Sequence, residues 1–235
     1  MLVSIVIPVY NEFLTLPQVL ARVRAAPLPE GCEREILVVD DGSTDGTHAL
    51  LAAAAADGVR TIASEAPGPR GKGAAIRTAL AHARGAIVLI QDGDLEYDPA
   101  DHARLIVPLL RHEADVVFGS RFLTGRSRRE LGMTRSAWLA NKLLARTANA
   151  LYRAAITDEA TAYKAFRADL LRGLDLHCQK FEFCPEVTAK LCRRGIPIHE
   201  VPIAYNARSR AQGKKITARD GLAALFTLLR YRRWC

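Results

Sequence analysis

The chain opens with the apolar run Val3-Ser4-Ile5-Val6-Ile7-Pro8-Val9, which ends abruptly in the polar residues Tyr10-Asn11-Glu12. A short β-branched run bounded by polar residues is typical of a buried strand. Four further runs of this kind follow, at Glu35–Asp40, Val59–Ala63, Ala86–Gln91 and Val116–Gly119. Segments with helical composition lie between them, at Leu14–Ala26, Thr47–Ala56, Lys72–Arg84 and Pro99–His112. This alternation predicts an α/β fold, a mostly parallel sheet flanked by helices.

The second half of the chain gives weaker signals. Residues 125–132 are polar and rich in arginine, which favours a loop, and residues 136–155 favour a helix. Residues 196–205 alternate apolar and polar side chains, which predicts a strand. We expect one domain over residues 1–217, followed by a basic amphipathic helix over 218–235. Such a helix fits two roles equally well, packing on its own domain or binding at a membrane surface.

Composition excludes several classes of protein. No 18 consecutive apolar residues occur, so no segment is expected to span a bilayer, and the first residues read as a strand and not as a signal peptide. The five cysteines form no CxxC pair, which argues against a zinc site and favours free thiols in a reducing compartment. We therefore expect the protein in the cytoplasm.

Charge is distributed unevenly along the chain. Residues 1–120 hold 10 Lys or Arg against 16 Asp or Glu, whereas residues 121–153 hold 8 against 1 and residues 193–235 hold 10 against 2. The acidic half suits metal binding, and the basic half suits an anionic partner such as a phosphate-bearing substrate, a membrane surface or nucleic acid. Aromatic content is only 6%, and the basic stretches lack the interleaved aromatic residues of single-strand binders, so no nucleic-acid partner is expected.

Three acidic residues, Asp92, Asp94 and Glu96, alternate directly after the fourth predicted strand. Carboxylates grouped at the end of a strand repel one another unless a cation neutralises them. Oxygen ligands are those that Mg²⁺ and Mn²⁺ prefer, and such ions often keep open positions for phosphate groups. The pattern predicts a site for Mg²⁺ or Mn²⁺.

Two other strand ends favour a nucleotide. Asp40 and Asp41 follow the second strand, and two adjacent acids exceed what a capped turn needs, so they suit the base and ribose hydroxyls. Lys72 lies between two glycines at the start of a helix, where backbone amides and a cation favour a diphosphate. Ligands collect at these carboxyl ends of parallel strands. The spacing of a phosphate-binding P-loop is absent.

Taken in order, these motifs resemble family 2 glycosyltransferases, and more closely the dolichyl- or polyprenyl-phosphate sugar synthases. The similar blocks are residues 8–12, 40–47, 71–73, 92–96, 119–121, 158 with 163–167, 183–187, 200–205, 208 and 213–215. They extend over nearly the whole chain. The resemblance implies a GT-A fold and inverting transfer of a sugar from a nucleoside-diphosphate sugar, such as GDP-mannose or a UDP-hexose, to a polyprenyl phosphate.

The resemblance also implies roles for individual residues. The donor nucleotide and sugar would lie against Pro8, Tyr10, Glu12, Asp40, Asp41, Lys72 and Asp92. The metal would be held by Asp92, Asp94 and Glu96, although relatives often carry Gln at the last position. The acceptor phosphate would meet Arg121, Arg135, Arg208, Lys214 and Lys215. Catalytic residues would be Asp94, Arg121 and Asp158.

The acceptor is the least determined part of this interpretation. A hydroxyl acceptor needs a general base, whereas a phosphate monoester is already anionic and mainly needs positioning. The segment after Arg121 is dense in arginine and offers only Glu130 as an acid, which favours a phosphate; Asp158 is the other candidate base, unless it pairs with Lys164 or Arg167. The hydroxyl of a soluble or glycan acceptor remains the alternative, and a non-enzymatic nucleic-acid-binding module a distant one. A lipid acceptor would place the protein peripherally on the inner face of the membrane.

Overall fold

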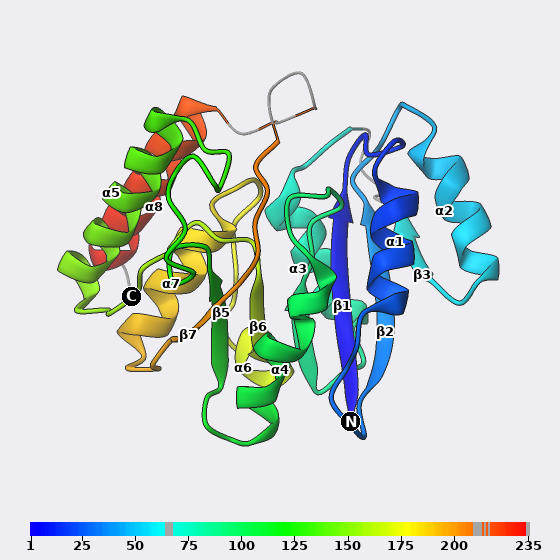
Figure 1. Ribbon diagram of the computed structural model, residues 1–235, viewed down its shortest axis with the longest axis horizontal. Coiled ribbons are helices and arrows are strands. Elements are labelled where there is room, and N and C mark those ends of the chain that lie inside the picture. Colours follow the sequence, from blue (N-terminus) through cyan, green and yellow to red (C-terminus); the bar gives the residue numbers. More distant parts are fainter. Residues whose placement is uncertain (64–67, 209–212, 214, 216, 234–235) are drawn as a thin grey trace.

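The computed structural model describes residues 1–63, 68–208, 213, 215 and 217–233. Seven strands form one sheet in the order β3-β2-β1-β4-β6-β5-β7 (Figure 1). Their bounds are β1 Leu2–Val9, β2 Glu33–Asp40, β3 Arg60–Ala63, β4 Ile87–Ile90, β5 Val116–Ser120, β6 Lys164–Arg167 and β7 His199–Pro202. All neighbouring pairs are parallel except those that β6 makes with β4 and β5. The predicted mostly parallel α/β sheet is therefore confirmed.

Helices cover both faces of the sheet, so the side chains of β1 and β4 are buried on both sides. The helices are α1 Leu16–Ala25, α2 Thr47–Ala56, α3 Lys72–His82, the 3-10 turn η1 Pro99–Asp101, α4 His102–Leu110, α5 Arg135–Tyr152, α6 Ala168–Arg172, α7 Phe183–Arg193 and α8 Ala218–Arg233. One core joins alternate residues of β1 to α1 and α4, with Ile5, Val19 and Leu105 among its members. The other core contains Val6 from the opposite side of β1 and Ile76 from α3.

Helix α8 packs on the body of the protein along one side. Ala224 and Leu228 are buried in a small third core with Leu144 and Ala148 of α5. The Tyr152 hydroxyl donates a hydrogen bond to the carbonyl of Leu228. Figure 1 shows α5 and α8 lying side by side at one end of the sheet. Of the two roles expected for this helix, packing on its own domain is observed, and the other side of the helix stays exposed.

Two parts of the second half differ from the expectation. No element was predicted at strand β6 or helix α7, and the expected strand over residues 196–205 is confined to His199–Pro202. Because β6 runs antiparallel, its first residue, Lys164, pairs with Ile90 and Phe118 near the carboxyl ends of β4 and β5. The residues just before β6 therefore arrive at the edge of the sheet where the acidic motifs lie.

Candidate active site

Acidic side chains from three strand ends meet at one edge of the sheet. Glu12 follows β1, Asp40 ends β2 and Asp41 comes directly after it, and Asp92 and Asp94 follow β4. These strands are adjacent and parallel, so their carboxyl ends lie together. This topology confirms that the acids at the strand ends converge at one edge of the sheet, which we refer to as the acidic edge.

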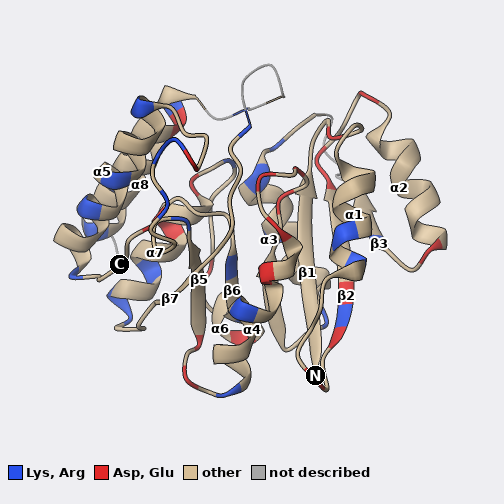
Figure 2. Cartoon of the chain, viewed as in Figure 1, with Lys and Arg blue, Asp and Glu red and all other residues tan. Residues whose placement is uncertain are grey.

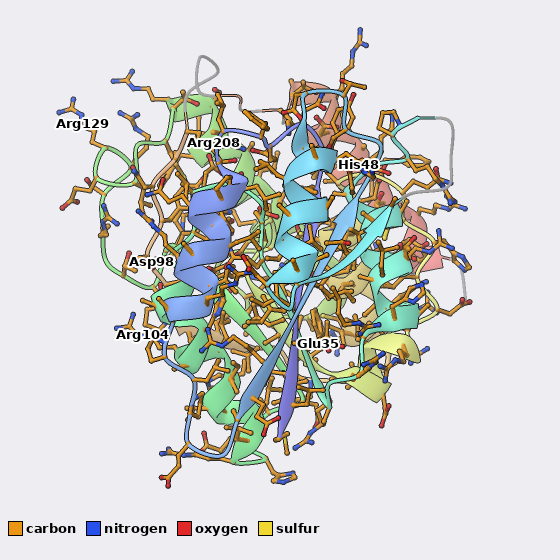
Figure 3. All side chains as sticks on the ribbon, turned by 90° about the vertical axis from the view of Figure 1, so that its right-hand side faces the viewer. Glu35, His48, Asp98, Arg104, Arg129 and Arg208 are labelled. Atoms are coloured by element: carbon orange, nitrogen blue, oxygen red, sulfur yellow. The ribbon has the colours of Figure 1, made fainter. Side chains whose placement is uncertain are left out.

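A guanidinium from the distant C-terminal part of the chain lies across two of these acids. Arg208 Nη2 donates to Asp94 Oδ2 at 2.6 Å, and its Nη1 donates to Glu12 Oε2 at 3.3 Å. Lys215 Nζ reaches the other Glu12 oxygen at 2.7 Å and also donates to the carbonyl of Tyr10. Figure 3 shows Arg208 at the same end of the molecule as His48, near the start of α2. Two of the cations expected at phosphate, Arg208 and Lys215, thus cover the acidic edge itself.

Burial, together with the nearby carboxylates of Asp92 and Glu96, raises the pKa of Asp94 to about 7 against the lowering effect of Arg208. Asp94 is 8% exposed. An additional cation would stabilise a carboxylate that has this many negative neighbours. The electrostatics at this edge therefore favour a divalent ion.

Asp92 pairs with Lys72, whose ammonium donates to Asp92 Oδ1. Although burial alone would lower the pKa of Lys72, the charge of Asp92 and this hydrogen bond raise it above its ordinary value. Lys72 begins α3 and Asp92 follows β4, so the pair links two motifs that the sequence separates by about 20 residues. Lys72 is a cation placed directly at the acidic edge.

The backbone amides at the start of α3 are not free for a diphosphate, which corrects the expectation for this helix end. Gly73 N donates to the carbonyl of Lys180 at 2.9 Å, and Ala74 N donates to that of Gln179 at 2.8 Å. A Cβ on Gly73 would lie 2.9 Å from the Cys178 sulfur, so only glycine allows this approach. Any attraction of α3 for phosphate therefore rests on Lys72.

The carboxylate of Asp41 holds the loop that leads into α3. Its two oxygens accept hydrogen bonds from Arg70 N at 2.9 Å and Gly71 N at 2.6 Å. Asp40 Oδ1 accepts from Ser43 N at 3.0 Å, which closes the turn after β2. Both acids are buried. Their expected contacts with a nucleoside stay predictions, and the structure adds a local bracing role for each.

The β1 loop is tied to the β2 loop. Asn11 N donates to Ser43 Oγ at 2.9 Å, and Thr44 N donates to Asn11 Oδ1 at 2.7 Å. Asn11 has a φ of 52°, a left-handed conformation that asparagine tolerates. Pro8 and Tyr10, both half-buried, flank this connection at the expected position for lining a nucleoside pocket.

Glu96 differs from the other two acids of its motif. Its Oε2 accepts from the Tyr205 hydroxyl at 3.0 Å and its Oε1 from Arg208 N at 2.7 Å. Within the described residues, no three His, Cys, Asp or Glu side chains are grouped as a ready metal site. Asp92 and Asp94 fit a divalent ion best, because each carboxylate is paired with the side chain of a Lys or Arg whose charge an ion could replace.

Arg121, which follows β5, forms a buried ion pair with Asp158. Arg121 Nε and Nη2 donate to the two carboxylate oxygens at 2.7 Å and 2.6 Å, and Arg121 N donates to Oδ2 at 3.0 Å. Asn141 of α5 accepts from Arg121 Nη2 at 2.8 Å. Asp158 is fully buried. The alternative interpretation paired it with Lys164 or Arg167, but Lys164 donates to the carbonyl of Glu159 and Arg167 to the carboxylate of Asp115. Both carboxylate oxygens of Asp158 are engaged, which favours a role in positioning Arg121 over a role as a base.

The remaining predicted residues lie around this pair or outside it. Arg135 begins α5 and is exposed, as is Glu130 in the preceding loop, whereas Lys214 lies outside the described residues. Figure 3 shows Arg129 at the outer edge of the same loop. Arg121 thus reaches the site from the end of β5, whereas the expected contact of Arg135 with the acceptor phosphate stays a prediction.

Three side chains that complete the site were not predicted from the sequence. Tyr205 contacts Glu96, Asn141 contacts Arg121, and Glu200 of β7 accepts from Asp158 N at 3.0 Å and from Thr157. The only available signal was that two of these three lie in blocks of the family resemblance. Their contacts arise between segments far apart in the chain, which periodicity does not reveal.

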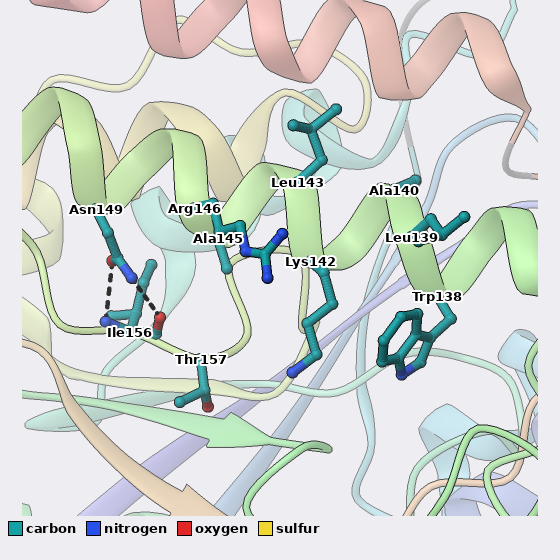
Figure 4. A pocket seen from close by; sticks show the side chains of 10 residues that line it. All are labelled: Trp138, Leu139, Ala140, Lys142, Leu143, Ala145, Arg146, Asn149, Ile156 and Thr157. Atoms are coloured by element: carbon teal, nitrogen blue, oxygen red, sulfur yellow. Dashed lines mark hydrogen bonds between the residues drawn. The ribbon is translucent and has the colours of Figure 1, made fainter.

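A pocket of about 640 Å³ lies beside the Arg121–Asp158 pair, between α5 and residues 156–157 (Figure 4). Trp138, Leu139, Leu143 and Ile156 supply apolar lining, and Lys142 and Arg146 add positive charge. Lys142 Nζ lies 3.9 Å from the centroid of the Phe122 ring, next to Arg121 in sequence.

Exposed apolar side chains continue from this pocket onto the neighbouring helix. Leu139 and Leu143 of α5 and Leu222, Phe226 and Leu229 of α8 are all more than half exposed. Figure 2 shows that α5 and α8 also carry Lys and Arg, coloured blue. We refer to these five apolar residues as the apolar face. Among the described residues, no helix combines the length and the apolar character needed to cross a membrane.

Comparison with known proteins places this site in context. Over 215 residues the chain is 33% identical to an undecaprenyl-phosphate 4-deoxy-4-formamido-L-arabinose transferase of Sodalis glossinidius (strain morsitans), covering 90% of this chain and 62% of that protein. The chain therefore spans about three fifths of the length of this curated relative.

Solved structures of a glucosyl-3-phosphoglycerate synthase from Mycobacterium tuberculosis share the fold. The UDP complex has a TM-score of 0.72 at 25% identity, over 98% of this chain and 79% of the other. The complex with Mn²⁺ and UDP-glucose has a TM-score of 0.71 at 25% identity, over 97% and 78%. The fold is thus that of GT-A glycosyltransferases, as expected. The model of the family described as Glycosyl transferase family 2 matches residues 4–174, and the chain belongs to this family.

Proposed function

We propose that the protein transfers a sugar from a nucleoside-diphosphate sugar, with UDP as the carrier, to the phosphate of a polyprenyl phosphate. The observation that carries the proposal is the junction of two charge sets at one sheet edge. Asp92 and Asp94 with Lys72 form the first set, and Arg121 held by Asp158 forms the second. The first suits a metal-bound diphosphate and the second a phosphate nucleophile.

The choice of donor has two supports. Glycosyl transferase family 2 is matched over residues 4–174, and the related structures named above contain UDP or UDP-glucose. In this chain the loops after β1 and β2, which are joined through Asn11 and Ser43, would form the walls of the nucleoside pocket. Pro8, Tyr10, Glu12, Asp40 and Asp41 lie in these walls, at the end of β1 and in these loops.

A bound Mg²⁺ or Mn²⁺ would stabilise the negative charge that develops on the departing diphosphate. Asp92 and Asp94 would hold it, and Arg208 would turn from Asp94 toward the phosphates. Glu96 would stay on Tyr205 and the backbone of residue 208, and so would orient the strap over residues 205–208. Lys72 and Lys215 would add positive charge around the leaving group.

On the acceptor side, Arg121 would bind the phosphate and Asp158 would hold the guanidinium in place. Arg135, at the start of α5, would be the second phosphate contact. A phosphate oxygen attacks the anomeric carbon without first losing a proton, so no general base is needed. The observed engagement of both Asp158 oxygens fits this chemistry better than transfer to a hydroxyl.

The apolar face and the pocket beside it would meet the lipid. The pocket on α5 has room for part of a prenyl chain, and Lys142 and Arg146 at its rim suit an anionic amphiphile. Leu222 and Phe226 of α8 would insert among lipid head groups, which would make the protein peripheral on the membrane. Curated relatives at this similarity include a transferase named for undecaprenyl phosphate.

A second candidate is transfer to a soluble phosphate-bearing acceptor. It is favoured by the likeness to a synthase whose structures include phosphoglyceric acid. The acidic edge and Arg121 would serve both acceptors, whereas the apolar face would serve only the lipid.

The test is a panel of UDP- and GDP-sugars with undecaprenyl phosphate, with 3-phosphoglycerate or with no acceptor, in Mn²⁺, reading nucleoside diphosphate release. We expect release from a UDP-sugar that depends on undecaprenyl phosphate. Release that requires 3-phosphoglycerate instead supports the second candidate. Release from none of the combinations overturns both.

A further inference from the structure

Tyr205 touches both halves of the site. Its hydroxyl donates to Glu96 Oε2 at 3.0 Å, next to the acidic edge. Its ring centroid lies 5.0 Å from the guanidinium carbon of Arg121, on the acceptor side. The side chain is only 4% exposed, and it packs against the ring of Tyr97 at 5.2 Å. Among the contacts described above, no other side chain joins the two charge sets in this way.

The backbone around Tyr205 is fastened to the acidic motif at several points. Tyr97 and Tyr205 form an antiparallel bridge, and Asn206 N donates to the carbonyl of Glu96 at 2.9 Å. Arg208 N donates to Glu96 Oε1 at 2.7 Å. Because of these contacts, we expect a movement of Tyr205 to alter the direction of Glu96 and the distance between Arg208 and Asp94.

The chemistry of the ring suits both contacts. Burial raises the pKa of the Tyr205 hydroxyl above its ordinary value, so the hydroxyl keeps its proton and serves as a donor to the Glu96 carboxylate. The face of an aromatic ring is electron-rich and attracts the Arg121 guanidinium. The Arg121 guanidinium is thus held by an ion pair with Asp158 and lies over the ring of Tyr205.

We propose that Tyr205 is a positioning residue that couples the two substrates, so that filling the donor side sets the Arg121 guanidinium for the acceptor phosphate. This inference rests on the proposed function. A donor that draws Arg208 from Asp94 shifts the strap and Tyr205 with it, and Arg121 follows. The coupling is reciprocal by thermodynamic necessity, so an acceptor in place strengthens donor binding by the same factor.

The test measures the dissociation constant of UDP with Mn²⁺, with and without saturating undecaprenyl phosphate in detergent micelles. The ratio of the two constants is the coupling, which we expect to be about 5-fold or more in the natural protein. Tyr205→Phe keeps the ring on Arg121 and removes the bond to Glu96, and Tyr205→Leu removes both. Tyr163→Phe is the matched control, because Tyr163 also stacks on Tyr97 but its hydroxyl bonds to the neutral side chain of Gln91 and not to a carboxylate.

In Tyr205→Phe we expect the ratio to fall to about one and, because the coupling is reciprocal, the acceptor KM at saturating donor to rise by about the same factor of 5. In Tyr205→Leu the ratio is also about one, and the acceptor KM rises further than in Tyr205→Phe because the cation–π contact is lost as well. Tyr163→Phe keeps the natural ratio. A Tyr205→Phe variant with the natural ratio overturns the coupling, even if Tyr205→Leu does not fold. The coupling is also overturned if the natural protein binds UDP equally tightly with and without undecaprenyl phosphate. Failure of the natural protein to bind UDP or GDP overturns the proposed function itself.

Discussion

The acidic edge and the Arg121–Asp158 pair solve the burial of charge in different ways. At the acidic edge, the carboxylates end the strands and their cations arrive from far along the chain, as Arg208 does for Asp94 across 114 positions. Those cations are less buried than Arg121, whose side chain is 6% exposed: the side chain of Arg208 is 13% and that of Lys215 38% exposed. Around Arg121, the cation is itself buried and its carboxylate partner has no exposure at all.

This difference separates exchangeable charge from fixed charge. A Lys or Arg side chain that water can still reach can leave its carboxylate to a metal ion or a diphosphate at a smaller cost than a fully buried one, because water replaces part of the lost contact. A buried pair cannot be opened in this way, because it leaves one charge without a partner in a poorly solvated place. At the acidic edge the cations can therefore change partners, whereas Arg121 and Asp158 stay paired with each other.

The largest effect should come from the exchangeable side. Asp94→Asn should reduce sugar transfer by at least about 100-fold at any Mn²⁺ or Mg²⁺ concentration, because the leaving diphosphate loses its metal. The thermal midpoint should change little, since the buried carboxylate is replaced by a neutral group of the same shape. Asp98→Asn is the control, an exposed acid of the same segment whose side chain caps the turn at Ala100. Full activity of the natural protein in EDTA would contradict the metal role.

On the fixed side, Arg121→Ala should lose stability as well as activity. Leaving Asp158 buried and unpaired should cost about 3–5 kcal/mol in the free energy of unfolding, measured by denaturant titration. Arg121→Ala combined with Asp158→Asn should recover most of this stability but none of the acceptor-dependent activity. Recovery of activity in the double variant would show that Arg121 does not bind the acceptor.

A pH effect should also separate the two regions. Glu159, fully buried beside the fixed pair, has its pKa raised by burial to about 7. The unfolded carboxyl ionises near pH 4.5 while the folded one stays neutral, so stability falls as pH rises from about 4.5 to about 7. The full penalty, of order 3 kcal/mol, is reached above pH 7.

Glu159→Gln should remove this penalty. Its gain in the free energy of unfolding should be small at pH 5 and approach its full value at pH 8, as measured by denaturant titration at both pH values. A gain that is the same at pH 5 and pH 8 would show that Glu159 does not titrate in this range.

The smallest effect concerns the apolar face. The protein should sediment with anionic vesicles at low salt and be released as salt rises, since each Lys or Arg near such a surface contributes about 1 kcal/mol. Phe226→Glu on α8 should reduce vesicle binding about 10-fold by removing apolar burial. Leu14→Glu is the control, a leucine next to α1 on the acidic half that is 89% exposed, more than the 66% of Phe226. Equal losses in both variants would remove the support for a lipid-facing α8.

The sequence alone predicted the features that depend on local pattern. The runs Val3–Val9 and Ala86–Gln91 are strand-like in composition, and acids placed directly after them must meet if the strands are parallel neighbours. The family resemblance named Arg121, Arg208 and Asp158 before any contact was known. What each of these residues contacts could not be read from spacing.

Tertiary structure decided those contacts for physical reasons. The antiparallel direction of β6, a strand of four residues with the polar Lys164 at its buried start, brings Asp158 to Arg121. The close approach of residues 178–180 to Gly73 uses the amides that the start of α3 would otherwise offer to phosphate. The return of the chain after β7 places Tyr205 and Arg208 on the acidic motif. Each is a long-range contact made by burial and hydrogen bonding together, which no local period encodes.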